Sequence, residues 1–385
     1  FSNLVTNSNG ALNGITNNTV TATNKTFNAN SFSNITAGTG QVTIMNVAGG
    51  TTGNTVSNNT ISNIASGGSI TGISISSTAG NSTVSNNTIS GISSTAAGAP
   101  NLIGIQTQNA TTITGNSISN ISVGASGNSI VYGIFIATAT SVTASQNTIH
   151  TLSGAGTGAT TAINGIALLT SGNTYNITKN RIYNLSQSAA TGTANPLVNG
   201  VLISANNANT TANLNNNFIS DLRTPVANIV DAIRAINITS TSATSAYNVF
   251  YNTIYLKATS SGTNFGSTGI FHTGNATATT ATLTLRNNII DNESVPNGTG
   301  RTVAFRRGSA LANLVNYGST SNNNSFYAGL ASANNLVFFD GTNADQLITN
   351  FQTRVNTPAR DAASVSVKPV FVNIAAAPYD LHLQT

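Results

Sequence analysis

The chain of 385 residues contains no cysteine and no tryptophan, one methionine and only 7 prolines. Without cysteine it has neither a disulfide framework nor a cysteine-based metal site. Only 5% of its residues are charged, and no Asp or Glu occurs before Asp221. The net charge of +5 therefore rests on few side chains, and no basic stripe alternates with aromatic residues. These features argue against a nucleic-acid partner.

Long hydrophobic runs are also missing. No apolar stretch approaches the length that a membrane-spanning helix requires, so we expect no membrane span. The polar, nearly uncharged composition favours an extracellular or cell-surface setting. Phe1 starts within the repeat pattern, since Asn3-Leu4 matches Asn34-Ile35. We therefore expect a segment of a larger protein, with any signal peptide upstream.

What the sequence does contain is a repeat, marked by an asparagine two residues before an apolar residue. We name these residues the marker asparagines: Asn30, Asn59, Asn87, Asn116, Asn147, Asn180, Asn217, Asn252, Asn288 and Asn324. Their spacing of 28 to 37 residues is typical of a solenoid, in which each coil buries its apolar face only against its neighbours. About eleven coils at ~4.8 Å each would form one elongated rod.

A second marker, a small residue followed by an apolar one, recurs in phase with the first. Its copies are Gly72-Ile73, Gly104-Ile105, Gly133-Ile134, Gly165-Ile166, Gly200-Val201, Ala232-Ile233, Gly269-Ile270 and Ala304-Phe305. Apolar residues then alternate with period two, as in Ile73 and Ile75, which predicts short half-buried strands. In the Ala232 copy we expect Ile233 and Ala235 to point inward, with a bulge shifting Ile236 and Ile238.

The marker asparagines are predicted to be structural. Asparagine tolerates the left-handed backbone region and bonds to nearby backbone groups, which suits a bend between two strands. When coils stack in register, successive amides are expected to hydrogen-bond as a ladder along the rod. No marker asparagine is predicted to be catalytic.

The last 51 residues differ in character, so we divide the chain into coils at 1–334 and a closing coil with a cap at 335–385. Thr342 followed by Asp345 resembles a capping box, and apolar residues near 343–355 fall on one helical face. A short helix there would cover the last coil, whose unpaired edge would otherwise recruit other strands.

The closing segment also carries a resemblance. The phrases Asp361 to Ser364, Pro369 to Val372 and Asp380 to Leu383 resemble, in order, the closing segment of secreted right-handed parallel β-helix proteins, particularly of Bacteroidota. One departure is Lys368, where such proteins usually have Asp before the proline. The resemblance implies an all-β, right-handed single-stranded parallel β-helix of about 10–11 coils with a C-terminal capping helix. It further implies a bacterial surface protein exported by the type IX system of that group.

Proteins with this pectate-lyase-like fold include lyases, glycosidases and non-catalytic adhesins, so the fold alone leaves the function open. A lyase needs clustered carboxylates for Ca²⁺, and a glycosidase needs two facing carboxyls. We place Asp231 in a column with Tyr132, Asn164, Asn199 and Thr268, and Asp291 and Glu293 in a loop. No column holds carboxylates on adjacent coils. We therefore favour a non-catalytic function and keep a polysaccharide lyase or glycoside hydrolase as the alternative.

The most promising surface is the outward column two residues after the small-residue marker. It comprises Ser74, Gln106, Phe135, Ala167, Leu202, Arg234, Phe271 and Arg306. Exposed aromatics and arginines beside Tyr132 and Asp231 would bind sugars or another protein domain. The predicted ligand-binding residues are thus Tyr132, Phe135, Asp231, Arg234, Phe271 and Arg306, although Arg234 and Asp231 also fit a solvated ion pair.

We therefore expect a non-catalytic adhesin or structural rod that belongs to a larger secreted protein. Its expected partners are glycans, surface proteins and other domains of the same protein. No cofactor is expected, and structural Ca²⁺ is compatible with the composition without being indicated by it. The three histidines are scattered, which argues against a metal site. Ice binding is a second alternative, but the phrase Thr280 to Thr284 does not recur at the same phase in neighbouring coils.

Overall fold

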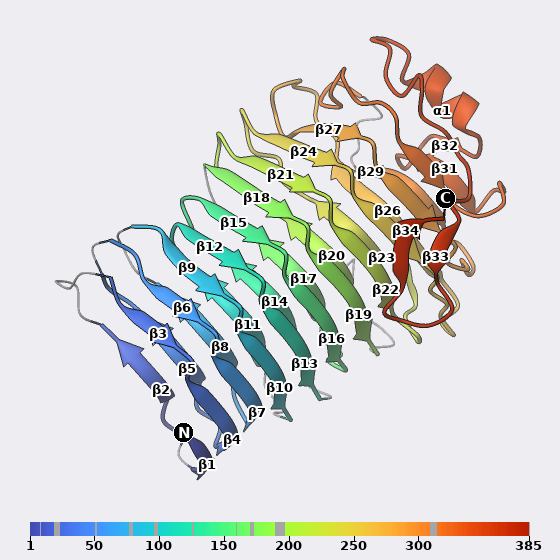
Figure 1. The fold of residues 1–385 in the computed structure, drawn as a ribbon. Coiled ribbons are helices and arrows are strands. Elements are labelled where there is room, and N and C mark those ends of the chain that lie inside the picture. Colours follow the sequence, from blue (N-terminus) through green and yellow to red (C-terminus); the bar gives the residue numbers. More distant parts are fainter. Residues whose placement is uncertain are drawn as a thin grey trace.

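The structure is a computed structural model in which the chain winds into a right-handed parallel β-solenoid of about ten coils (Figure 1). It describes residues 1–7, 9–18, 24–50, 52–76, 80–95, 99–124, 127–158, 160–169, 173–188, 197–308 and 314–384. A typical coil gives one strand to each of three sheets, which we name A, B and C. The predicted fold class is confirmed.

Sheet A contains the strands that follow the marker asparagines. Its 11 strands are β1 (Ser2–Val5), β4 (Ser31–Ala37), β7 (Thr60–Ser66), β10 (Thr88–Ser94), β13 (Ser117–Val123), β16 (Thr148–Gly154), β19 (Arg181–Gln187), β22 (Phe218–Arg223), β25 (Thr253–Leu256), β28 (Ile289–Asn292) and β30 (Ser325–Tyr327).

Sheet B contains the strands that carry the small-residue marker. Its 12 strands are β2 (Leu12–Asn17), β5 (Val42–Val47), β8 (Ile70–Ile75), β11 (Asn101–Thr107), β14 (Ile130–Ile136), β17 (Ala162–Leu168), β20 (Val198–Ile203), β23 (Ile229–Ile238), β26 (Phe265–Thr273), β29 (Thr302–Gly308), β31 (Asn335–Phe339) and β32 (Ala344–Asp345). Only β32 pairs antiparallel.

Sheet C contains the strands that precede the marker asparagines. Its 9 strands are β3 (Thr26–Asn28), β6 (Thr55–Ser57), β9 (Ser82–Ser85), β12 (Thr111–Thr114), β15 (Val142–Ser145), β18 (Thr174–Thr178), β21 (Thr211–Asn215), β24 (Ala246–Phe250) and β27 (Thr282–Arg286). The remaining elements are the helix α1 (Ile348–Arg354) and the antiparallel strands β33 (Phe371–Asn373) and β34 (Asp380–Leu383).

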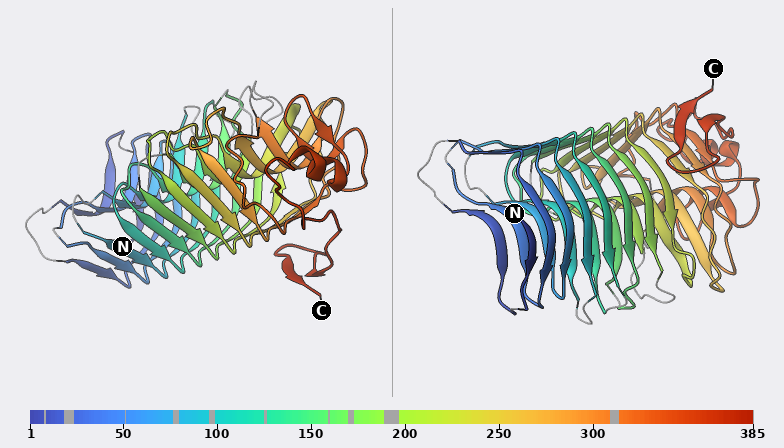
Figure 2. Two further views of the ribbon diagram at one scale, coloured as in Figure 1. Left: turned by 90° about the horizontal axis from the view of Figure 1, so that it is seen from above. Right: turned by 60° about the horizontal axis from the view of Figure 1, so that its bottom comes forward.

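The core consists of apolar columns that run along the rod. Ile61, Ile89 and Ile118 are register partners on sheet A, and all three are fully buried. The strands of one sheet lie side by side along the whole rod (Figure 2). Burying such a side chain contributes roughly 1.5–3 kcal/mol. Since every coil repeats these positions, the core is continuous from the first coils to the last.

The marker asparagines form the predicted ladder. The Asn87 side chain donates from Nδ2 to Asn116 Oδ1 at 2.9 Å and to the Val56 carbonyl at 2.9 Å. The Asn87 backbone N–H donates to the same Asn116 oxygen at 3.0 Å. The same side-chain link joins each marker asparagine to the next from Asn30 to Asn324.

The left-handed backbone position was predicted at the wrong residue. Positive φ occurs one residue before the marker, at positions such as Asn58 (54°), Gln146 (57°) and Lys179 (57°). The marker itself does not adopt it. This left-handed residue makes the bend, and the marker side chain then lies buried inside the turn, where its amide bonds to the neighbouring coils.

The C-terminal cap ends the ladder with a carboxylate. Asn324 donates from Nδ2 to Asp361 Oδ1 at 3.0 Å and from its backbone N–H to Ser364 Oγ at 2.9 Å. Asp361 also accepts a hydrogen bond from the Tyr317 hydroxyl at 2.6 Å. The phrase Asp361 to Ser364 thus takes the place of the next marker asparagine.

The capping helix is present but shorter than predicted. It covers Ile348–Arg354, and its N-cap residue Leu347 makes no side-chain capping bond. The expected capping box is wrong, because Asp345 lies in β32 and forms an ion pair with Arg354 at 2.7 Å. Phe351 is buried on the rings of Phe305, Phe326 and Phe338, so the helix covers the end of the core.

No helix among the described residues is long and apolar enough to cross a membrane.

The last residues return to the outer face of sheet A. Tyr255 makes edge-on contacts with Phe371 at 5.7 Å and with Tyr379 at 5.3 Å, measured between ring centroids. Arg181 donates from Nη2 to the Tyr379 carbonyl at 2.6 Å. The strands β33 and β34 lie near β22 (Figure 1), and the segment that contains them packs on outward side chains of β22, β25 and β28.

Candidate binding face of sheet B

Two outward columns of side chains define the outer face of sheet B. We name them column 1 and column 2. The register places Ile103, Tyr132, Asn164, Asn199, Arg234, Thr268, Val303 and Leu336 in column 1. It places Ser74, Gln106, Phe135, Ala167, Leu202, Asn237, Phe271, Arg306 and Phe339 in column 2.

This register corrects the prediction for the coil that contains Asp231. Ala235, not Ala232, is the residue on which Gly200 stacks, and Ile236 and Ile238 pair with Val201 and Ile203 as the inward residues. Arg234 therefore belongs to column 1, and Asn237 takes its expected place in column 2. The bulge exists, but it lies between Ile229 and Ile233, before the marker instead of after it.

The bulge brings Asp231 to the same face as Arg234. Ile229 and Ile233 are four residues apart but pair with Phe265 and Ser267, which are only two apart, so two extra residues bulge out between them and Asp231 lies within the bulge. Gly266 on the adjacent strand makes room for the bulge, since a Cβ there would lie 2.1 Å from the Val230 carbonyl oxygen. Asp231 thus joins no regular column, contrary to the predicted stack with Tyr132, Asn164, Asn199 and Thr268.

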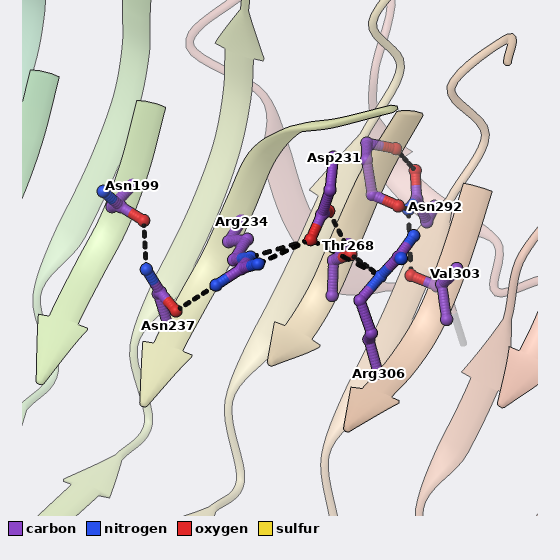
Figure 3. A network of polar contacts seen from close by, with 9 residues as sticks. Asn199, Asp231, Arg234, Asn237, Thr268, Asn292, Val303 and Arg306 are labelled. Atoms are coloured by element: carbon purple, nitrogen blue, oxygen red, sulfur yellow. Dashed lines mark hydrogen bonds and ion pairs between the residues drawn. The ribbon is translucent and has the colours of Figure 1, made fainter. Parts of the chain in front are cut away.

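Asp231 and Arg234 form a buried ion pair, so the solvated pair proposed above is wrong. Arg234 Nε and Nη2 lie 2.9 and 2.8 Å from Asp231 Oδ2, and the two side chains are only 10% and 6% exposed. Thr268 donates to Asp231 Oδ1 at 2.6 Å (Figure 3). Burial alone would raise the pKa of Asp231, but Arg306, Arg234 and the Thr268 hydrogen bond together lower it below its usual value.

Amide side chains extend this network along the rod. Arg234 Nη1 donates to Asn237 Oδ1 at 3.0 Å, and Asn237 Nδ2 donates to Asn199 Oδ1 at 2.9 Å (Figure 3). Asn199 in turn donates to Asn164 Oδ1 at 2.9 Å. A continuous chain of hydrogen bonds therefore links Asp231 to the middle of the face.

Arg306 joins the network from the next coil. Its Nε donates to Thr268 Oγ1 at 2.9 Å and lies 3.5 Å from Asp231 Oδ2. Phe271 lies beneath the Arg234 guanidinium, whose Cζ is 3.4 Å from the ring centroid. We name Asp231, Arg234, Arg301 and Arg306 the arginine cluster.

A groove lies at the other end of the same face. It has a volume of about 820 Å³. Its lining residues are Thr39, Gln41, Gly67, Gly68, Ser69, Thr71, Ala99, Pro100, Asn101, Ile103, Gln106 and Phe135. None of these is charged. Phe135 stacks on Tyr132 with ring centroids 4.6 Å apart, and burial raises the pKa of Tyr132 to about 12. The groove is therefore a neutral, hydroxyl- and amide-lined channel with an aromatic end.

The predicted ligand-binding residues thus form two separate groups. Tyr132 and Phe135 lie together at the groove, and Asp231, Arg234, Phe271 and Arg306 lie together in or beside the arginine cluster. Four strands of sheet B lie between β14 and β29, so these two strands are five one-coil steps apart, about 24 Å in all. The sequence reasoning missed Thr268, Asn237 and Arg301. A correct register at Ala235 would have revealed Asn237.

Two further carboxylates lie under the C-terminal segment. Asp291 belongs to β28 and is fully buried, so its placement in a loop is wrong; Glu293 follows this strand. Glu293 forms an ion pair with Lys368. Neither carboxylate oxygen of Asp291 has a hydrogen-bond partner, and burial raises its pKa to about 7, with a further contribution from Glu293. Asp291 and Glu293 are thus two residues apart in the chain, and the closing segment contacts them through Lys368.

Within the described part of the chain, no three His, Cys, Asp or Glu side chains gather in a way that would hold a metal ion. His272, for example, lies inside the rod, where its Nδ1 contacts Arg307 at 2.8 Å and its Nε2 contacts the Ala281 carbonyl at 2.7 Å. Burial lowers its pKa well below the usual value, and Arg307 lowers it further.

The fold and the ladder define the class of this protein as a parallel β-solenoid with an internal asparagine ladder. Comparisons with family models, with curated proteins and with solved structures gave no match.

Proposed function

We propose that this chain is a non-catalytic extracellular binding rod, part of a larger bacterial surface protein, that holds glycan chains along the outer face of sheet B. The observation that carries the proposal is the groove with Phe135 at its end, whose ring stacks on the buried Tyr132. Aromatic rings offer flat apolar surface to sugar rings, while hydroxyl and amide groups supply directional hydrogen bonds. The resemblance of the closing segment to Bacteroidota surface proteins supports the cell-surface setting.

The shape of the groove favours a polymer. Its lining residues come from the coils of β5, β8, β11 and β14, which span about 14 Å along the axis. Gln41, Thr71 and Gln106 present polar groups at successive steps along this path. An extended saccharide lying parallel to the axis would meet similar groups on each coil.

The test is a glycan array probed with the whole chain and with Phe135→Ala. We expect the variant to lose at least tenfold in affinity, because it removes the aromatic end of the groove. Phe250→Ala serves as the matched control, since Phe250 is a half-buried outward aromatic on sheet C. Absence of glycan binding by the parent chain, or equal binding by the Phe135 variant, would disprove the proposal.

A second candidate function is ice binding, favoured by the outer face of sheet C. Two adjacent columns bear hydroxyl groups on four successive coils: Thr55, Thr83, Thr112 and Thr143, and Ser57, Ser85, Thr114 and Ser145. The columns lie about 6.7 Å apart, and their members repeat every ~4.8 Å. This is a regular two-dimensional array, and it lies on other strands than the phrase Thr280 to Thr284.

Thermal hysteresis and ice-crystal shape provide the readout for this second function. Thr112→Lys places a long charged side chain at the centre of the array and should abolish any activity. Ser90→Lys, an outward change on sheet A, should leave it intact. Equal growth of ice in the presence and absence of the parent chain would eliminate this candidate.

A further inference from the structure

The arginine cluster carries an excess of positive charge. Arg234 and Arg306 face a single carboxylate, Asp231, and Arg301 adds a third positive charge next to Arg306. Arg234 satisfies that carboxylate with Nε and Nη2 and uses Nη1 for Asn237. The charge of Arg234 is thus compensated, whereas Arg301 and Arg306 share at most the weaker 3.5 Å contact of Arg306 with Asp231.

Two guanidinium nitrogens of this cluster are buried without a hydrogen-bond partner. They are Nη1 of Arg301 and Nη2 of Arg306. Leaving a buried charged donor unpaired costs more than leaving a neutral one, so such groups are normally paired. Desolvation lowers the pKa of Arg306, and Arg234 and Arg301 lower it further, although Asp231 opposes them. These two donors are therefore free to bond to an anionic acceptor.

Phe339 holds the two guanidinium groups at one place. The Cζ atoms of Arg301 and Arg306 lie 4.1 and 5.0 Å from the centroid of its ring. Phe339 is the register partner of Arg306 in column 2, so the ring lies on the outer face of sheet B. Arg301 and Phe339 are half-buried, so the cluster reaches the surface of this face.

We propose that Arg301 and Arg306 bind the oxyanion of an acidic saccharide, a carboxylate or a sulfate, above the ring of Phe339. A guanidinium group donates two parallel hydrogen bonds to such an oxyanion, and these charge-assisted bonds are stronger than neutral ones. The ring of Phe339 fixes the guanidinium groups by cation–π contact and offers apolar surface to the sugar. The inference rests on the proposed glycan-binding function and narrows its ligand to acidic chains.

Calorimetry with three oligosaccharides of equal length tests this: a uronic-acid chain, a sulfated chain and a neutral chain. We expect at least one acidic chain to bind tenfold or more tightly than the neutral one. Arg301→Gln and Arg306→Gln should each reduce this preference to about twofold. The uronic-acid and sulfated chains distinguish the two sources of oxyanion.

The matched control is Arg286→Gln, which removes the same charge at an exposed position at the end of β27 on sheet C. An equal loss of preference in this control would show a general charge effect and overturn the site. Arg306→Lys keeps the charge but not the paired donors, so it should not restore binding. Thermal melting of each variant verifies folding. Arg301 is half-buried and is not bonded to Asp231 or Thr268, so its variant tests the site even if Arg306→Gln fails to fold.

The two proposals fail in different ways. If neutral and acidic chains bind equally, and Phe135→Ala removes both, the groove is confirmed and the oxyanion site is refuted. If inorganic sulfate binds through Arg301 and Arg306 while no oligosaccharide binds, the anion site stands and the glycan function is refuted. If neither sulfate nor any acidic chain binds, the inference is overturned outright.

Discussion

At the scale of single residues, the marker asparagines do more than fill turns. Within the ladder, each side chain uses its oxygen for two donors of the preceding coil. Its nitrogen donates to a carbonyl on the sheet C strand of the preceding coil and to the next marker. Since the markers from Asn59 to Asn324 are buried, their side chains satisfy polar atoms that no water reaches. This explains why the residue type recurs although its position is not the left-handed one.

Asn147→Ala is therefore expected to destabilise the rod locally. It leaves the backbone N–H of Asn116 without its side-chain acceptor, removes one of the hydrogen bonds of Asn116 Nδ2, and removes the hydrogen bond that Asn147 donates to the Ile113 carbonyl. Each unsatisfied buried group costs about 1–3 kcal/mol, so the total should amount to several kcal/mol. Urea unfolding followed by circular dichroism provides the measurement. Asn30→Ala, at the half-buried start of the ladder, should cost clearly less; equal losses would show that the ladder is not the source of stability.

Asp291 gives a pH dependence of the opposite sign to that of a typical carboxylate. Its pKa is raised from 3.8 to about 7 by burial and by Glu293, while Lys368 and Lys257 oppose the shift. Tyr255 is also close, because Asp291 is among the charges that raise the pKa of that tyrosine. Between these two pKa values the folded chain binds more protons than the unfolded chain. Stability should therefore fall as the pH rises through this window and level off above it.

Asp291→Asn tests this dependence. The variant cannot ionise, so its advantage over the parent chain should grow from about pH 4 to about pH 7. One pKa unit corresponds to about 1.4 kcal/mol, so the difference should reach a few kcal/mol. Thermal melting at a series of pH values measures it. A constant difference across the series would show that Asp291 is ionised throughout, for example through an ion pair with Lys368.

At the scale of elements, helix α1 matters through one side chain. Phe351 is fully buried against three phenylalanines at the end of the core, whereas the neighbouring Leu347 is 53% exposed. The helix has only 7 residues, too few to be stable without this contact. The cap therefore depends on aromatic packing more than on helix propensity or capping.

Phe351→Ala should release the helix from the rod. Truncating a buried phenylalanine costs about 3–5 kcal/mol, and the exposed end of the solenoid should then promote association. Hydrogen exchange across residues 335–361 should rise, and light scattering should detect larger species. Leu347→Ala is the control and should change neither. Unchanged exchange in the Phe351 variant would mean that the rest of the closing segment holds the cap.

Elements with a strict period were predictable, and those that break the period were not. The ladder and the inward columns follow from the spacing of Asn59, Asn87 and Asn116, because equal spacing forces equivalent positions to stack. The strand β23 misled the prediction, because Ala232-Ile233 imitates the true marker Ala235-Ile236 three residues later. The alternation of apolar residues cannot locate this bulge, because both Ile233 with Ala235 and Ile236 with Ile238 form apolar pairs two residues apart.

The candidate site was predictable only in part for a related reason. Tyr132 and Phe135 could be paired because their coil is regular. The position of Arg301 outside the strands, and the burial of Asp231, depend on how the bulge and Gly266 bring neighbouring coils together. Such contacts between irregular segments leave no periodic signal in the sequence.

At the scale of the whole molecule, the rod is a stack in which each coil contacts mainly its two neighbours. Stability in such a molecule is approximately a sum over coils and their interfaces. The ladder adds a direction, because in every bond between two marker side chains the amide donates towards the C-terminus, where Asp361 accepts the last bond. A negative group at the donor end of aligned amides is favourable for the same reason as an anion at a helix N-terminus.

Removing exactly one coil should therefore preserve the fold. Deleting residues 148–180 joins Asn147 to Arg181, which is the register partner of Thr148, so all columns close again in phase. We expect a folded rod, shorter by about 4.8 Å, with a somewhat lower melting temperature and an intact ladder. Small-angle scattering and circular dichroism provide the measurements.

The matched control deletes half a coil, residues 148–163, and joins Asn147 to Asn164, which places a column 1 residue where sheet A should begin. Inward and outward positions then no longer stack, and this variant should not fold cooperatively.

The one-coil deletion also brings the groove and the arginine cluster one step closer together. A long acidic saccharide that contacts both should change its affinity in this variant, whereas short chains that occupy either site alone should bind as before. If the one-coil deletion unfolds like the half-coil deletion, the coils are not equivalent units, and the additive account of the rod is refuted.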